Sequence, residues 1–273
     1  MPTLLTDIGG TKARFCWLKN GKLGKLTEYR CENFKTPYQV INKFIGDFPE
    51  KFDEIILAGA GPIIKGQICW TNRPLWKISE KELLKKYHLK RVLILNDVQA
   101  QGEGLKTLYK CEKTSILMTA GTGLGSCFIV NGKVISGEIG QVKVNKNEKI
   151  EDTVSGTGIV NLYHTLGGNK KIKSARQIDK LRENKDKIAQ LTYKTFYQKW
   201  GEISADLVTA LYAQGGVYLW GGLIPKNEKD KKDLSTAYQK SLPSVFKTIP
   251  LRLVKNKMLA FKGLQSLSNH KFG

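Results

Sequence analysis

The chain has 273 residues, 41% of them hydrophobic, which is enough for one large domain or two ordinary ones with a packed core. Its apolar runs are much shorter than the roughly 18 residues that a membrane span requires, and no secretory leader pattern opens the sequence, so we expect a soluble, cytoplasmic protein without a membrane partner. The formal net charge of +21 would suit a nucleic-acid binder, but lysines and arginines are spread over the chain among acidic residues, which favours a solvated basic surface and no nucleic-acid partner.

The cysteines and histidines support no metal or nucleophile site. The five cysteines are odd in number, scattered and without a C-x-x-C pair, so we expect buried reduced thiols rather than disulfides or a zinc site. The three histidines follow no metal-ligand spacing and lie near no nucleophile motif, which leaves zinc chemistry and a Ser-His triad without support.

The first hundred or so residues alternate strand and helix patterns. Buried apolar runs predict the strands, and helical spacing of apolar residues predicts the helices. Asn20-Gly21 predicts a hairpin turn, and Ser79 with Glu82 has capping-box spacing at the start of a helix. Strands are expected at 3–8, 13–19, 24–31, 53–61 and 91–97, and helices at 37–48, 79–88 and 98–108.

From residue 114 the pattern begins again. The segments DIGGTKARFCWLKNGKL and TAGTGLGSCFIVNGKVI both place a glycine turn before a hairpin whose tip is NGK. The sequence therefore predicts an α/β fold in two halves of like topology, with no linker between them. The later expectations are strand, turn, strand, turn and strand within 114–138, mainly helix at 158–214, strands at 216–222 and 249–254, and helices at 234–242 and 258–267.

The two glycine turns suggest a phosphate clamp. Neither has the G-x-x-x-x-G-K-[ST] pattern of a P-loop, and a strand rather than a helix follows GTGLGS, so it is no dinucleotide fingerprint. Taken singly, each turn reads most simply as a tight hairpin turn. Two such turns facing each other across a cleft can instead hold a polyphosphate with backbone N–H groups, threonine hydroxyls and a lysine charge, and the first aspartate then lies where the hydration shell of Mg²⁺ would be. The predicted clamp comprises Asp7, Gly9, Gly10, Thr11, Lys12, Gly121, Thr122 and Gly123.

Carboxylates and amides near the glycine turns suggest a polyhydroxylated ligand. Asn96 and Asp97 end a buried strand, which is the usual place for sites in α/β sheets. Glu138 and Glu151 lie beside glycine turns, and Asn72 lies between aromatic residues in WTNRPLW. Each alone reads as a loop residue, but together they can take the paired hydrogen bonds of sugar hydroxyls.

An ordered set of motifs resembles the bacterial glucokinases, which belong to the sugar kinase, Hsp70 and actin superfold. The motifs are DIGGTKARF, LAGAGPI, WTNRPLW, LILNDVQAQGEG, AGTGLGS, GEIGQ, VSGTGIVNLY and WGGLIPK, and they run from residue 5 to about 226. The resemblance implies an α/β protein with the two-domain actin-like ATPase (ribonuclease H-like) fold and a cleft between the domains. The small domain would comprise residues 1–106 and about 256–273, and the large domain residues 107–255.

The resemblance also implies an activity. It is the ATP-dependent phosphorylation of a hexose at its 6-hydroxyl, most simply glucose to glucose 6-phosphate in glycolysis, with Mg²⁺, in a cytoplasmic enzyme that could be a homodimer. Asp97 matches the family's general base, which takes the proton of the 6-hydroxyl. Gly221 and Gly222 would lie near the adenosine of ATP. The residues that match sugar ligands or a motif near the sugar are Asn72, Asn96, Asp97, Glu138, Gln141 and Glu151.

Departures from the family pattern keep other functions open. Gln141 replaces the histidine of GEGGH, a sugar ligand near C1 and C2, and the longer glutamine stem predicts a looser site with weaker discrimination at C2. NKMLAFKG replaces NPGLLG, and Lys12, which stands where most glucokinases have asparagine, is more typical of the related repressor and kinase (ROK) family. The cysteine-rich zinc motif of the ROK family is absent, which points to the glucokinase branch. The alternatives are a kinase for another hexose such as an N-acetyl amino sugar, a non-catalytic sugar or nucleotide sensor and, on charge alone, a nucleic-acid binder.

Overall fold

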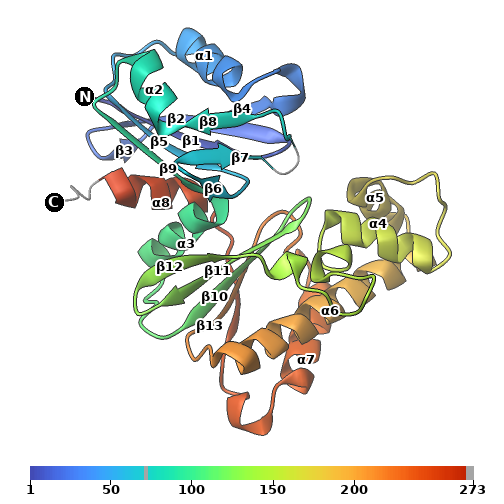
Figure 1. Ribbon diagram of the computed structural model, residues 1–273. Helices are drawn as coiled ribbons and strands as arrows, with labels where there is room; N and C mark the ends of the chain where they lie inside the picture. Colours follow the sequence, from blue (N-terminus) through green and yellow to red (C-terminus); the bar gives the residue numbers. More distant parts are fainter. Residues whose placement is uncertain (71–72, 269–273) are drawn as a thin grey trace. The chain divides into compact units, whose positions relative to one another are not determined.

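The computed structural model describes residues 1–70 and 73–268, and its internal contacts divide the chain into two compact units. The first unit comprises Met1–Lys110 and the segment that begins at Asn256, and the second comprises Cys111–Lys255. Each unit is built on its own large sheet with helices packed against it (Figure 1). Among the helices of the described residues, none is both long and apolar enough to cross a lipid bilayer.

The large sheet of the first unit has six strands. They are β1 (Thr3–Ile8), β2 (Lys12–Lys19), β3 (Lys22–Leu23), β4 (Thr27–Arg30), β5 (Glu54–Gly59) and β9 (Arg91–Asn96). Their order is β3-β2-β1-β5-β9, with β4 also paired to β2; β1, β5 and β9 are parallel, whereas β2 is antiparallel to β1. Asn20 and Gly21 have φ angles of 50° and 71°, the left-handed values that the two-residue hairpin between β2 and β3 requires.

Helices lie on both faces of this sheet (Figure 1). They are α1 (Pro37–Asp47), α2 (Glu80–Tyr87), α3 (Asp97–Leu108) and α8 (Leu259–Ser268). Because strand side chains alternate between faces, Leu4 packs in the core that α1 and α2 cover, and Leu5 packs in the core that α3 and α8 cover. Gly104 and Gly263 let α3 and α8 touch, since a Cβ at either position would overlap backbone of the other helix.

The structure contains one small sheet that the sequence patterns do not predict. Its strands are β6 (Ile63–Ile64), β7 (Gln67–Cys69) and β8 (Lys77–Ser79), and they pair antiparallel. Strands of two or three residues are too short to show a periodic pattern. The strand expected at 24–31 begins only at Thr27, since Gly24 still belongs to the β2–β3 hairpin, where its N–H donates to the Trp17 carbonyl at 2.8 Å.

The second unit repeats the topology of the first. Its strands are β10 (Ser115–Ala120), β11 (Leu124–Val130), β12 (Lys133–Gly137), β13 (Gly216–Trp220) and β14 (Leu251–Leu253). Their order β12-β11-β10-β13-β14 matches β3-β2-β1-β5-β9 strand for strand and with the same directions. Asn131 and Gly132 form the corresponding hairpin turn, with φ angles of 49° and 74°. The prediction of two halves with like topology is confirmed.

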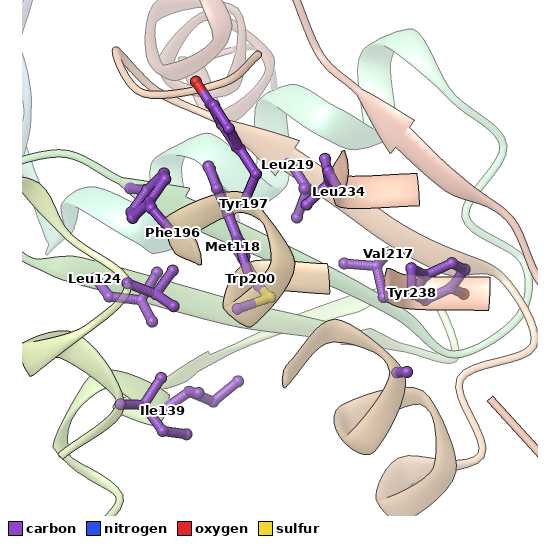
Figure 2. Close-up of a cluster of buried hydrophobic side chains, with 14 of the residues drawn as sticks. Met118, Leu124, Ile139, Phe196, Tyr197, Trp200, Val217, Leu219, Leu234 and Tyr238 are labelled. Atoms are coloured by element: carbon purple, nitrogen blue, oxygen red, sulfur yellow. The ribbon is translucent and has the colours of Figure 1, made fainter. Parts of the chain in front are cut away.

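A helical layer covers one face of the second sheet. Its helices are α4 (Gly156–Thr165), α5 (Ala175–Glu183), α6 (Lys187–Leu211) and α7 (Glu228–Ser241). Figure 2 shows how Phe196 and Trp200 of α6 lie in one cluster with Met118 of β10. Gly201 brings α7 close to α6, since a Cβ there would overlap the Leu234 carbonyl. This apolar layer anchors β10 and β13, whose ends carry the residues considered next.

Candidate functional site

In the first unit, the predicted site residues gather at the carboxyl edge of the large sheet. The parallel strands β1, β5 and β9 end in register, with Ile8 opposite Gly59 and Gly59 opposite Asn96. The first glycine turn follows β1, and Asp97 follows β9, so both are presented at the same edge. This is the edge at which α/β sheets usually bind their ligands.

Hydrogen bonds to carbonyl groups hold the first glycine turn. Gly9 donates its N–H to the Lys12 carbonyl at 2.9 Å. The Nε of Arg73 donates to the Gly10 carbonyl at 2.8 Å, and the Arg73 guanidinium lies 4.6 Å from the centroid of the Trp76 ring. Fixing the carbonyl groups also orients the N–H groups of the turn, which are the groups that an anion would need.

Cys31 supports the same turn. Its N–H donates to the Thr11 carbonyl at 2.9 Å, and its Sγ lies 3.4 Å from the Gly9 carbonyl oxygen. Burial raises the pKa of the Cys31 thiol to about 11, so the group stays protonated and packs as a small apolar side chain. Cys16, Cys31, Cys111 and Cys127 are buried, as expected, whereas Cys69 is only partly buried.

Two charged groups of this turn are paired within the unit. Asp7 is 3% exposed, and its Oδ2 accepts from Arg14, its neighbour on β2. The exposed Lys12 forms an ion pair with Glu28, with Nζ and Oε1 2.6 Å apart. Since Arg14 engages one Asp7 oxygen, the other can accept from a water molecule around Mg²⁺, so the donor set fits a water-mediated site.

Asn96 and Asp97 form the junction of β9 and α3. The Asn96 Oδ1 caps the helix by accepting from the Val98 N–H at 2.9 Å, and its Nδ2 donates to the Gly61 carbonyl at 3.2 Å. Asp97 is the first residue of the helix, is half-buried, and accepts from the same Val98 N–H at 2.9 Å. The N-terminal end of a helix favours negative charge, so this is a position at which a carboxylate is stabilising.

The second glycine turn joins β10 to β11 and is fastened to the start of α4. Gly121 donates its N–H to the Gly123 carbonyl at 2.9 Å, and the Gly156 N–H donates to the Gly121 carbonyl at 2.8 Å. The Thr157 hydroxyl donates to the Thr122 carbonyl at 3.2 Å. A Cβ at Gly156 would lie 2.9 Å from the Gly121 oxygen, so the close approach depends on glycine. The turn itself is exposed.

The predicted carboxylates of the second unit lie beside this turn. Glu138 precedes a 3₁₀ turn, η2 (Ile139–Gln141), and Glu151 lies in the next one. A Cβ built on Gly123 would be 3.1 Å from the Glu151 Oε2, so the glycine turn and the carboxylate adjoin. The Gln141 Nε2 donates to the Glu151 Oε1. We call Glu138, Gln141 and Glu151 the carboxylate cluster.

The electrostatics of the carboxylate cluster are set by two acids and one lysine. Partial desolvation raises the pKa of the Glu138 carboxyl, although the residue keeps much of its surface exposed, and the Glu151 carboxylate raises it further. Like charges at one site resist ionising together. Lys149 adds a positive charge beside the cluster, and its Nζ donates to the Gln141 Oε1 at 2.6 Å.

Gly221 and Gly222 follow β13 at the same edge of the second sheet. Trp220, the last residue of β13, pairs with Thr119 of β10. Gly221 has a φ of +114°, and a Cβ there would overlap the Ala120 carbonyl oxygen, so packing alone requires glycine. A Cβ at Gly222 would meet nothing within 4 Å, which leaves this glycine open to a ligand.

The structure adds two residues to the predicted set. Arg73 bonds to the first glycine turn, and Lys149 bonds to Gln141. Arg73 is the basic residue of WTNRPLW, which was a usable signal, whereas Lys149 reaches Gln141 only because its loop folds back. Both ends of the Gln141 amide are hydrogen-bonded, and weaker discrimination at C2 stays a prediction. The predicted ligand Asn72 lies outside the described residues.

Known proteins resemble this chain in both sequence and structure. A family profile described as Glucokinase matches residues 4–271. The glucokinase of Rhizobium etli is 28% identical over 310 residues, which cover 97% of this chain and 91% of that protein. A glucokinase from an Antarctic psychrotroph has a TM-score of 0.79 at 22% identity, over 98% of this chain and 99% of its own. A ROK family glucokinase from Streptomyces griseus, solved with glucose and AMPPNP, has a TM-score of 0.75 at 16% identity, over 98% and 99%.

Proposed function

This chain belongs to the glucokinase family of sugar kinases and has the two-domain actin-like ATPase fold, and from that premise we propose that it phosphorylates glucose with ATP. In the proposed reaction the 6-oxygen of the sugar bonds to the γ-phosphorus, and the bond from that phosphorus to the β,γ-bridging oxygen breaks. ADP leaves, and the hydroxyl proton passes to Asp97. The protein would work by positioning and charge neutralisation, without a covalent intermediate on the enzyme.

ATP is assigned to the glycine turns. Their N–H groups and threonine hydroxyls would bind phosphate oxygens, Lys12 would add a positive charge, and the open position at Gly222 leaves room for the nucleoside. The Streptomyces griseus glucokinase, whose structure holds the ATP analogue AMPPNP, supports this assignment through the shared fold. The proposed ATP ligands are Gly9, Gly10, Thr11, Lys12, Gly121, Thr122, Gly123, Gly221 and Gly222.

Mg²⁺ is assigned to the carboxylate at the end of β1. Asp7 would hold it through water, because Arg14 already engages the Asp7 Oδ2. When bound, the ion would offset the negative charge of the phosphates.

The sugar is assigned to the hydrogen-bonding side chains that the sequence predicts. Asp97 would orient the 6-hydroxyl and accept its proton, and Asn96 would keep Asp97 in place by capping α3. The carboxylates of the second unit would accept hydrogen bonds from ring hydroxyls, and the amide of Gln141 would donate one. The proposed sugar ligands are Asn72, Asn96, Asp97, Glu138, Gln141 and Glu151.

One observation carries this proposal: an exposed glycine turn adjoins a cluster of hydrogen-bonding side chains, with Gly123 next to the Glu151 carboxylate. A donor and an acceptor of a phosphoryl group must meet at such a junction. The test measures ADP release with purified protein, ATP and Mg²⁺ across a panel of hexoses, with a control that lacks sugar. We expect release that depends on glucose. Release that is independent of every sugar would contradict a sugar kinase, and no release at all would favour the sensor.

A kinase for an N-acetyl amino sugar is the second candidate. The observation that favours it is Gln141, because its amide N–H can donate to an acetyl carbonyl as well as to a hydroxyl oxygen. The same panel separates the two candidates when it includes N-acetylglucosamine and N-acetylmannosamine. A higher kcat/KM for either of these than for glucose would replace glucose as the substrate.

A further inference from the structure

The side chain of Gln141 is held at both ends by residues of one returning loop. Its Oε1 accepts from the Lys149 Nζ at 2.6 Å, and its Nε2 donates to the Glu151 Oε1. The loop folds back on itself because Ile150 donates its N–H to the Val142 carbonyl at 3.0 Å. The fold therefore brings a cation and a carboxylate to opposite ends of one amide.

The chemistry of these partners determines which way the amide points. A lysine ammonium can only donate and an ionised carboxylate can only accept, so the carbonyl oxygen of Gln141 faces Lys149 and its NH₂ group faces Glu151. One N–H is bonded to Glu151, and the second has no acceptor among residues 1–70 and 73–268. Lys149 is half-buried, whereas Lys143 and Lys146 on the same loop are exposed, so the fold directs this lysine toward the cluster.

We propose that Lys149 is a positioning and specificity-determining residue of the sugar site. It holds the Gln141 amide so that the second N–H is presented as a donor to an oxygen atom of the sugar, beside carboxylates that accept from sugar hydroxyls. This inference rests on the proposed function and deepens it. The site then offers one fixed donor among acceptors, and a hydroxyl that donates to Glu151 while accepting from Gln141 satisfies both.

Removing the ammonium releases the amide. Without Lys149, the Gln141 carbonyl loses its partner and the side chain regains rotameric freedom, so the donor N–H is no longer held toward the ligand. Lys149 touches Gln141 rather than the reacting atoms, and its loss therefore acts on sugar affinity and not on the phosphoryl-transfer step. A split between hexose KM and kcat is the signature of this role.

The experiment compares Lys149→Met, which keeps the aliphatic stem, with Lys149→Arg, which keeps a donor, using the hexose with the highest kcat/KM in the wild type. Lys146→Met is the matched control, since this lysine lies on the same loop and forms no ion pair within the described part of the chain. We expect the hexose KM of Lys149→Met to rise about 5- to 10-fold, the scale of one hydrogen bond, with kcat and ATP KM within about two-fold. Lys149→Arg should recover most of the loss, and Lys146→Met should match the wild type.

The affinity for the hexose, measured by calorimetry without ATP, should weaken by the same factor. If Lys149→Met folds poorly, Gln141→Met takes its place and should show the same hexose-specific effect. An unchanged hexose KM and affinity in folded Lys149→Met would overturn the proposal while the kinase activity stands. Equal losses in Lys149→Met and Lys146→Met, or an equal change in ATP KM, would assign the effect to loop stability and also overturn it. If the wild-type protein phosphorylates no hexose, the proposed kinase function itself is contradicted, and the variants need not be compared.

Discussion

The two large sheets have the same strand order, but their glycine turns carry different chemistry. The turn after β1 is flanked by charges, since Asp7 pairs with Arg14 and Lys12 pairs with Glu28. The turn after β10 has no charged residue of its own and is fastened to α4 and to the Glu151 side of the carboxylate cluster. The same strand order thus ends in two kinds of edge: charged side chains flank the first turn, and a helix start and a carboxylate adjoin the second.

The largest expected effect is the loss of kcat on substitution of Asp97, the proposed general base in the first unit. Asp97→Asn keeps the size of the side chain and an oxygen for the Val98 N–H, but it removes the proton acceptor. We expect kcat to fall by at least about 10²-fold, as is typical for loss of a general base, while calorimetric hexose affinity changes little. Glu103→Gln is the control, since Glu103 lies on the same helix in an ion pair with Lys106. Near-normal turnover of Asp97→Asn would exclude Asp97 as the base.

The next largest effect is expected from a substitution in the glycine turn of the second unit, which should raise the ATP KM. Gly123→Val places a branched side chain in the turn and a Cβ 3.1 Å from the Glu151 Oε2. The ATP KM should rise about 10-fold or more, and the hexose KM should rise with it because Glu151 must move. Gly46→Val is the control for a glycine-to-valine change away from the site, since Gly46 is exposed on α1 and a Cβ there meets nothing within 4 Å. An unchanged ATP KM in folded Gly123→Val would make the turn purely structural.

A pH profile sharpens the electrostatic side of the comparison. Burial and the Glu151 charge hold the pKa of the Glu138 carboxyl above its ordinary value of 4.5, so Glu138 protonates earlier as the pH falls. We expect the hexose KM to rise on the acid side at a pH above 4.5, where the carboxylate that accepts from a sugar hydroxyl is lost. Glu151→Gln removes a like charge and should move the midpoint of this rise to lower pH, whereas Lys149→Met removes a nearby cation and should not lower it. An unchanged midpoint in Glu151→Gln would mean that the Glu151 charge does not raise the pKa of the Glu138 carboxyl.

The smallest effect on ATP KM is expected from Lys12, the exposed lysine that follows the first glycine turn. The Lys12–Glu28 pair is exposed, so Lys12→Gln should change the free energy of unfolding by less than about 0.5 kcal/mol. Its ATP KM should nevertheless rise several-fold, because the phosphates lose a positive charge. Lys19→Gln, which breaks the pair with Glu50 at the other end of β2, is the matched control and should leave ATP KM unchanged. Equal ATP KM values in the two variants would mean that Lys12 does not reach the phosphates.

Local signals explain why so much of the fold could be predicted. Asn20-Gly21 and Asn131-Gly132 occupy the left-handed backbone region that a two-residue hairpin needs, so the NGK tips marked the repeated hairpins correctly. Buried apolar runs marked the long strands, and the Ser79 cap marked the start of α2, where its oxygen accepts from the Glu82 N–H at 3.2 Å. The two- and three-residue strands β6, β7 and β8 left no such pattern and were missed.

Short motifs were enough to place the candidate residues at sheet edges, whereas contacts between distant segments could not be predicted. The glycine turns and Asp97 follow strands, so strand prediction alone brought them to sheet edges. The Arg73 bond to Gly10 joins residues 63 positions apart, and the restraint on Gln141 depends on a loop that folds back at Val142. Neither contact is visible in local sequence, because long-range packing decides it.

The most direct test of the account follows the phosphorus atoms themselves. Wild-type protein is incubated with ATP, Mg²⁺ and glucose, and the reaction is monitored by ³¹P NMR with proton correlation to locate the new phosphoester. We predict ADP and a hexose 6-phosphate in equal amounts, with almost no inorganic phosphate. Inorganic phosphate without a sugar phosphate, or a phosphoester at another hydroxyl, would contradict the proposed transfer to the 6-hydroxyl.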